Sequence, residues 1–125
     1  MSTRATIHFK DSVSAKPTAI IYRHSDGYPE GLGADLQAFV AQVKANCPDT
    51  RFTDAAYLAA KWVVYDADLH KRGEHQLSFL SVGVVNEDPG DIEYRYWVIC
   101  NGTPTIFCET AKGEARSMPQ GVNLI

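Results

Sequence analysis

Apolar and polar residues alternate in some parts of the chain and recur at helical spacing in others, and these two periods predict strands and helices. The predicted order is two strands, two helices and three strands. The strands are expected over Ala5–Asp11, Thr18–Ser25, Gln76–Val85, Ile92–Cys100 and Thr105–Ala111, and the helices over about Leu32–Asn46 and Thr53–Lys71. The segment from Lys112 onward is expected to be irregular.

Each predicted helix has one apolar face, because large apolar side chains recur three or four positions apart. The apolar stripe consists of Leu36, Phe39, Val40 and Val43 in the first helix, and of Leu58, Trp62, Tyr65 and Leu69 in the second. Pro48 is expected to end the first helix. Thr53 or Asp54 is expected to cap the start of the second.

This order predicts an α+β domain of two layers. Short connections between consecutive strands favour antiparallel pairing. Helices that follow each other in sequence then pack together on one face of such a sheet. We therefore expect an antiparallel sheet of about five strands, in the order ββααβββ, with two helices packed on one face. A chain of 125 residues has the usual size of one domain, so a single domain over residues 1–125 is expected.

Composition and charge argue against several classes of function. Apolar residues make up 45% of the chain and charged residues 22%, as in ordinary globular proteins. The net charge of -3 argues against general binding of duplex nucleic acid, which requires clustered Lys and Arg. No apolar run approaches the roughly 18 residues that cross a bilayer, and residues 1–10 lack the apolar core of a signal peptide. A cytoplasmic protein without membrane contact is therefore expected.

The three cysteines, Cys47, Cys100 and Cys108, form no recognisable metal or disulfide pattern. Their number is odd and no CxxC spacing occurs, which argues against a disulfide scaffold and against a standard zinc site. We expect three reduced thiols that are mostly buried.

The segment IYRHSDGYPEGLGADL, residues 21–36, concentrates candidate chemistry in a bend between a strand and a helix. Alternation along the strand places Tyr22 and His24 on one side, and Arg23 and Ser25 on the other. The bend that follows adds further polar, aromatic and glycine residues. These are Asp26, Tyr28, Glu30, Gly31 and Gly33.

Two interpretations of this bend remain open. In the first, it is only a turn, in which the glycines form the corner while Glu30 and Asp35 satisfy the start of the helix. In the second, unpaired backbone N–H groups around Gly31 and Gly33 bind an anionic group. The segment lacks the full dinucleotide fingerprint and a Walker A lysine, so neither nucleotide motif is predicted.

His24 and Asp26 are a candidate acid–base pair, in which the carboxylate would orient the imidazole. With Glu30 as an acid, this set would suit a small hydrolase that acts on a phosphorylated metabolite. No GxSxG elbow or well-placed nucleophile accompanies the pair. A surface histidine that only forms hydrogen bonds is therefore the favoured interpretation.

A second histidine pair follows the second predicted helix. Asp66 and His70 are four residues apart and share a helix face, and His75 lies just beyond. These groups could ligate a metal, but a third ligand would have to come from elsewhere. We favour a charged pair on a solvated helix face, and we predict no metal site and no cofactor.

The run EYRYW, residues 93–97, carries the other candidate site. Alternation sends Glu93, Arg95 and Trp97 to one face of a strand. A carboxylate, a guanidinium and an indole in a row suit stacking on a planar ring beside a charged contact. The alternative is a cross-strand ion pair on an open sheet face, with Trp97 at the edge of the core.

Three segments carry a resemblance to a known group of proteins. They are STR at residues 2–4, the pattern Y-x-H-x-DGYPEG at residues 22–31, and DIEYRYWV at residues 91–98. They resemble a widespread group of small, uncharacterised bacterial and phage proteins. The resemblance implies a cytoplasmic accessory protein of phage type, and it implies no activity.

Two functions follow from these residues. The first is a non-catalytic binding protein that captures a small anionic or aromatic ligand, such as a nucleotide signal, or blocks a host protein in counter-defence. Its candidate binding residues are Arg4, Arg23, His24, Asp26, Tyr28, Gly31, Gly33, Glu93, Arg95 and Trp97. The arginines would neutralise phosphate, and the aromatic rings would stack. The second is the hydrolase based on His24, Asp26 and Glu30. A homo-oligomer would cover the strand edges.

Overall fold

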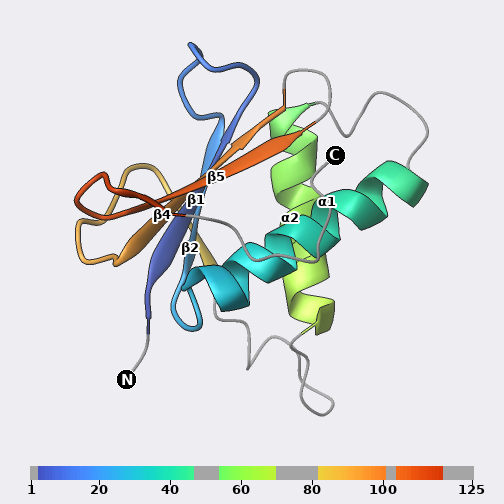
Figure 1. The fold of residues 1–125 in the computed structure, drawn as a ribbon. Coiled ribbons are helices and arrows are strands. Elements are labelled where there is room, and N and C mark those ends of the chain that lie inside the picture. The colour runs from blue at the N-terminus through green and yellow to red at the C-terminus, as the bar shows by residue number, and fades with distance from the viewer. Residues whose placement is uncertain (1–2, 47–53, 70–81, 101–103, 117–125) are drawn as a thin grey trace.

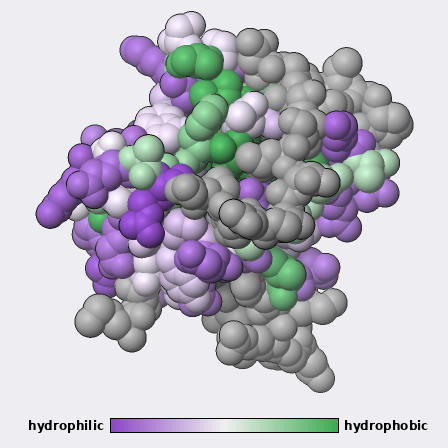
Figure 2. Space-filling view, in the orientation of Figure 1, coloured by the Kyte–Doolittle hydropathy of each residue, from purple (hydrophilic) through white to green (hydrophobic). Residues whose placement is uncertain are grey.

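The computed structural model describes residues 3–46, 54–69, 82–100 and 104–116. These residues form a sheet with two helices on one side of it (Figure 1). In the same orientation, hydrophilic residues cover much of the described surface, and hydrophobic residues form small separate patches (Figure 2). The predicted α+β class is confirmed.

The elements follow one another in the order ββααββββ. Their bounds are β1 (Ala5–Lys10), β2 (Ala19–Arg23), a short π-helical segment η1 (Pro29–Gly33), α1 (Ala34–Asn46), α2 (Ala55–Leu69), β3 (Val82–Val85), β4 (Tyr94–Ile99), β5 (Thr105–Thr110) and β6 (Ala115–Arg116). The second predicted helix and the third predicted strand also included positions within 70–81, which lie outside the described residues. Within the described α2, neither end is long or apolar enough, nor is any other described helix, for a membrane crossing.

The sheet is mixed and has six strands, in the spatial order β3-β2-β1-β4-β5-β6. Neighbouring strands are antiparallel except β1 and β4, which are parallel. The predicted sheet of about five antiparallel strands is therefore wrong in strand number and in this one pairing. The sixth strand, β6, lies in the segment that was expected to be irregular.

The parallel pair arises because consecutive strands do not always lie side by side. β3 pairs with β2 at one edge of the sheet, whereas β4 pairs with β1 in its centre. Residues 86–93 connect the two without a hairpin. The expectation of antiparallel pairing treated each short connection as a hairpin, and this connection is not one.

The core lies between the helices and one face of the sheet. Alternate residues of β1 and β4 point into it, including Ile7, Phe9 and Tyr96, none of which is exposed to solvent. The stripe predicted for the first helix is confirmed, because all four of its residues are buried. In α2, Leu58 and Trp62 are buried as predicted and Tyr65 packs against the core as a partly buried side chain, but Leu69 is 46% exposed. Asp66 occupies the inward position in this last turn instead.

Asp54 caps the start of α2, as one of the two predicted alternatives. Its Oδ1 accepts a hydrogen bond of 3.0 Å from the N–H of Ala56. The N–H of Ala55 donates to Oδ1 of Asp11, at 2.9 Å. The turn that follows β1 is thereby attached to the first residue of α2.

Candidate functional site

The bend after β2 is held against the rest of the fold by its glycine. The N–H of Gly27 donates to the carbonyl of Thr3 at 2.9 Å, and the buried Tyr96 hydroxyl donates to the carbonyl of Gly27 at 2.7 Å. A Cβ at Gly27 would lie 2.7 Å from the Cβ of Ala5, closer than such atoms approach. The position therefore requires glycine for packing.

The backbone groups at the start of the helix are already paired. Asp26 adopts a positive φ of 56°, and its carbonyl accepts the N–H of Leu32 at 2.9 Å. The N–H of Gly31 donates to the carbonyl of Tyr28 at 2.9 Å. Gly33 is buried within η1. This geometry fits the interpretation of the bend as a turn and leaves the N–H groups of Gly31 and Leu32 with acceptors of their own.

Arg23 lies in the interior rather than at a phosphate site. Its guanidinium is held between two helices, 3.1 Å from Asp35 of α1 and 3.3 Å from Asp66 of α2. Arg23 and Asp66 are each only 1% exposed. The interpretation that places Asp66 on a solvated helix face is therefore wrong, because its carboxylate neutralises a buried cation. His70 and His75 lie outside the described residues.

The remaining corner residues point to solvent. His24 is exposed, and its Nδ1 lies 3.1 Å from the hydroxyl of Tyr22, which confirms that the two share one side. His24 and Asp26 form no hydrogen bond with each other in this structure, so Asp26 does not orient the imidazole. Tyr28 and Glu30 are also exposed.

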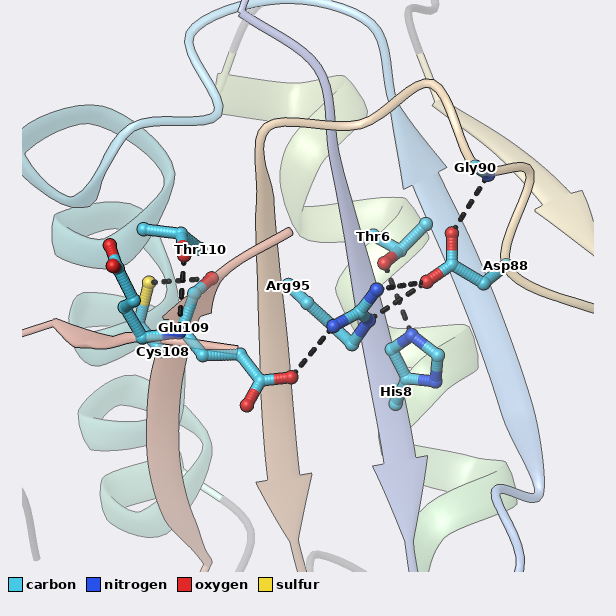
Figure 3. A network of polar contacts seen from close by, with 9 residues as sticks. Thr6, His8, Asp88, Gly90, Arg95, Cys108, Glu109 and Thr110 are labelled. Atoms are coloured by element: carbon cyan, nitrogen blue, oxygen red, sulfur yellow. Dashed lines mark hydrogen bonds and ion pairs between the residues drawn. The ribbon is translucent and has the colours of Figure 1, made fainter. Parts of the chain in front are cut away.

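Arg95 is fixed between two carboxylates on the sheet face that the helices do not cover. Its Nε donates to Asp88 at 2.8 Å, and its Nη1 donates to Glu109 at 2.7 Å. Figure 3 shows the guanidinium between the two acids, with the helices behind the sheet. Arg4 pairs with Asp91 at 3.4 Å. All three arginines that were predicted to neutralise phosphate therefore have carboxylate partners.

The two predicted parts of the site lie on opposite faces of the sheet. Arg23 contacts the helices, whereas Arg95 and Trp97 are on the uncovered face. Alternation correctly placed Arg95 and Trp97 on one face. The structure brings them together with residues of β1 and β5 instead of the bend.

Strand pairing aligns the side chains of the uncovered face in two rows. The polar row contains Gly83, Tyr22, Thr6, Arg95 and Glu109, and the apolar row contains Val85, Ile20, His8, Trp97 and Phe107, each in the strand order β3-β2-β1-β4-β5. Residues that pair across strands share a face and lie within contact distance. The apolar row thus crosses five strands, and its Phe107 is 53% exposed.

His8 is the central residue of the apolar row, and the sequence analysis did not identify it. Its ring stacks on Trp97, with centroids 4.4 Å apart and planes 30° apart. Lys10 places its ammonium 5.2 Å from the Trp97 ring centroid. The signal was present in the alternation of β1, which puts Thr6, His8 and Lys10 on the side opposite Ile7.

His8 is a buried and neutral histidine. It is 4% exposed, its Nε2 lies 3.1 Å from the hydroxyl of Thr6, and its Nδ1 has no hydrogen-bond partner in the described part of the chain. Burial, reinforced by the charge of Arg95, lowers the pKa of His8 from 6.5 to about 4. The ring therefore adds a flat, uncharged surface to the sheet at neutral pH.

The acids around Arg95 keep their charge. Burial opposes ionisation of Asp88, but the Gly90 N–H and the Arg95 guanidinium outweigh it and lower the pKa of Asp88. Burial likewise disfavours the Arg95 cation, yet its hydrogen bonds to Glu109 and Asp88 raise the pKa of Arg95. The polar row is thus a fixed network of charges rather than a set of groups ready to transfer protons.

One end of the uncovered face is acidic. Its charged residues belong to residues 86–93, to β5, and to the arginines that pair with them. They comprise five carboxylates, on Glu87, Asp88, Asp91, Glu93 and Glu109, and two guanidinium groups, on Arg4 and Arg95, which leaves a net charge of -3. A field of this sign attracts cationic groups.

The described thiols are not poised for chemistry. Cys100 and Cys108 are free and buried, as predicted, and Cys47 lies outside the described residues. Burial raises the pKa of Cys100 to about 12 and also raises the pKa of Cys108. Among the described residues, no group of three or more His, Cys, Asp or Glu side chains is arranged to hold a metal ion.

Comparisons of the chain with protein-family models, with curated proteins and with solved structures found no match. The functional argument therefore depends on the geometry of the site.

Proposed function

We propose that this chain is a non-catalytic binding protein that docks a protein partner on the uncovered face of its sheet. The observation that carries the proposal is the apolar row, in which five side chains lie in register across five strands. Aromatic side chains on a rigid scaffold, with few charges among them, are typical of the centre of a protein interface.

The geometry supports a protein partner over a nucleotide. A nucleotide site would need cationic groups available to phosphate, whereas Arg23 and Arg95 each contact two carboxylates. The stacked pair of His8 and Trp97 offers an aromatic surface, and Phe107 extends it toward β5. A flat row of this kind suits the side chains of another protein.

The hydrolase has less support. His24 bonds Tyr22 instead of Asp26, and the pKa of the buried His8 is too low for a general base near neutral pH. The raised pKa of Cys100 disfavours a thiolate nucleophile. These contacts favour binding over catalysis.

Charge further defines the partner. The acidic end of the face, with Asp88 and Glu109 beside the polar row, suits a partner that presents basic side chains next to an apolar residue. The resemblance to phage proteins makes a host protein the expected partner, and counter-defence the expected use.

Affinity capture with matched variants tests this proposal. Phe107 and Val13 are both exposed, at 53% and 72%, but only Phe107 belongs to the apolar row. We expect Phe107→Asp to abolish retention of a host protein that both the wild type and Val13→Asp retain. The captured protein is then purified, and its affinity for each variant is measured by calorimetry.

Two outcomes would contradict the proposal. One is equal retention by Phe107→Asp and Val13→Asp, which would place any contact elsewhere. The other is a rise in melting temperature with a nucleotide or cyclic dinucleotide that Trp97→Ala removes, which would indicate capture of a small ligand. Circular dichroism of each variant confirms that the fold survives.

A further inference from the structure

The second helix is apolar on both of its long faces. Its inward face carries Leu58 and Trp62, which have no solvent exposure. Its outward face carries Tyr57 and Val64, which are 49% and 70% exposed. A surface helix normally pairs one apolar face with one polar face, whereas a helix that is apolar all round lies between two layers.

The outward face of α2 borders a groove that it shares with α1. The groove has a volume of about 1120 Å³. Phe39 and Val43 of α1 and Tyr57, Ala60 and Val64 of α2 contribute to its mostly apolar lining. Exposed apolar surface gathered in a groove, unlike scattered apolar residues, marks an interaction site.

The charges of this outward face are arranged antisymmetrically about Val64. Lys61 lies three residues before Val64, and Asp68 lies four residues after it. Lys61 also places its ammonium 5.6 Å from the centroid of the Tyr57 ring. When two identical helices meet antiparallel at this position, the lysine of each faces the aspartate of the other.

We propose that the groove is a homodimer interface, in which a second copy of the chain packs its α2 antiparallel to this α2 around a twofold axis near Val64. The occupant is a second copy because the charge pattern is complementary to itself, as a twofold interface requires. The two copies exchange Lys61–Asp68 pairs at the rim, and Val64 and Tyr57 of one copy fill the groove of the other.

This inference does not depend on the proposed function. The groove is formed by the helices, whereas the apolar row lies on the sheet face that they leave uncovered. The dimer therefore leaves both apolar rows accessible, and either proposal can fail without the other.

Sedimentation velocity of the purified chain tests the dimer, over protein concentrations from about 1 to about 100 μM. We expect a species of twice the 13.8 kDa chain mass to form with rising concentration. Val64→Asp should weaken the dimer at least about tenfold, because it places charges on the axis. Val13→Asp, at a position that is 72% exposed and outside the groove, should leave it unchanged.

Charge reversal tests the antiparallel register. Lys61→Asp and Asp68→Lys should each weaken the dimer, and the variant with both changes should restore it, because it recreates both pairs with the signs exchanged. A monomer at every concentration overturns the proposal. A dimer that Val64→Asp leaves intact, or a double variant no stronger than the single ones, also overturns it.

Discussion

The imidazole of His8 stacks on the indole of Trp97, 4.4 Å away between ring centroids, on the sheet face opposite the helices. The two residues belong to the parallel strands β1 and β4, in the centre of the sheet. This contact joins the two halves of the apolar row. It also buries a titratable ring, and so it couples the stability of the fold to pH.

The stability of the protein should fall as the pH falls from about 6.5 to 4. In the folded protein the pKa of His8 is about 4, against 6.5 for a free side chain. The unfolded chain therefore binds more protons in this range, and stability is lost as the pH decreases. Full protonation should cost roughly 2 to 3 kcal/mol. Urea unfolding of the wild type and of His8→Gln at several pH values measures the difference, and parallel pH curves would contradict the prediction.

Removal of Arg23 should destabilise the protein strongly. Its side chain and that of Asp66 are each 2% exposed, so Arg23→Met leaves a buried carboxylate without its cation. A loss of about 3 to 5 kcal/mol is expected. Arg4→Met is the control, because the Arg4 and Asp91 side chains are 40% and 58% exposed, and it should cost less than about 1 kcal/mol. Denaturant unfolding compares the two, and equal losses would refute the buried pair.

Substitution of Gly27 should be more costly than substitution of Gly83. A Cβ at Gly27 would lie 2.7 Å from Ala5 Cβ and 2.9 Å from the Thr3 carbonyl oxygen, whereas at Gly83 nothing lies within 4 Å. Gly27→Ala should lose about 1 to 3 kcal/mol, and Gly83→Ala should change stability little. Thermal unfolding tests the pair, and similar melting temperatures would show that the bend relaxes freely.

Cys100 should resist alkylation in the native protein. Its pKa of about 12 lowers the thiolate fraction roughly a thousandfold relative to a thiol of pKa 9. Native labelling with iodoacetamide at pH 8, followed by peptide mass mapping, should find Cys100 unmodified until denaturant is added. Rapid native labelling of Cys100 would contradict its burial.

The elements could be predicted from the sequence because their signals are local. The alternation of β1 and the apolar stripe of α1 each occupy one short stretch, and both predictions are confirmed. The parallel pairing of β1 with β4 could not be predicted, because nothing near Ala5 or Tyr94 encodes a partner so distant in sequence. The same distance separates His8 from Trp97, which explains why the centre of the apolar row was missed.

The buried ion pair shows a second limit. A helix residue such as Asp66 has the same local pattern whether it faces water or a buried guanidinium. Only the crossing of α2 over β2 decides between these, and it places Asp66 at 3.3 Å from Arg23. By contrast, the contact of Arg95 with Glu109 follows from strand pairing, and a cross-strand ion pair on an open face was one of the predicted alternatives.

The position of β1 at the centre of the mixed sheet has a consequence for biosynthesis. During translation, β1 leaves the ribosome first and β2 soon joins it, but the other neighbour, β4, emerges only after both helices. Until then one hydrogen-bonding edge of β1 remains open on the nascent chain. Closing it requires contacts of long sequence separation, which form slowly. The nascent hairpin is therefore the species that a holding chaperone would protect from aggregation.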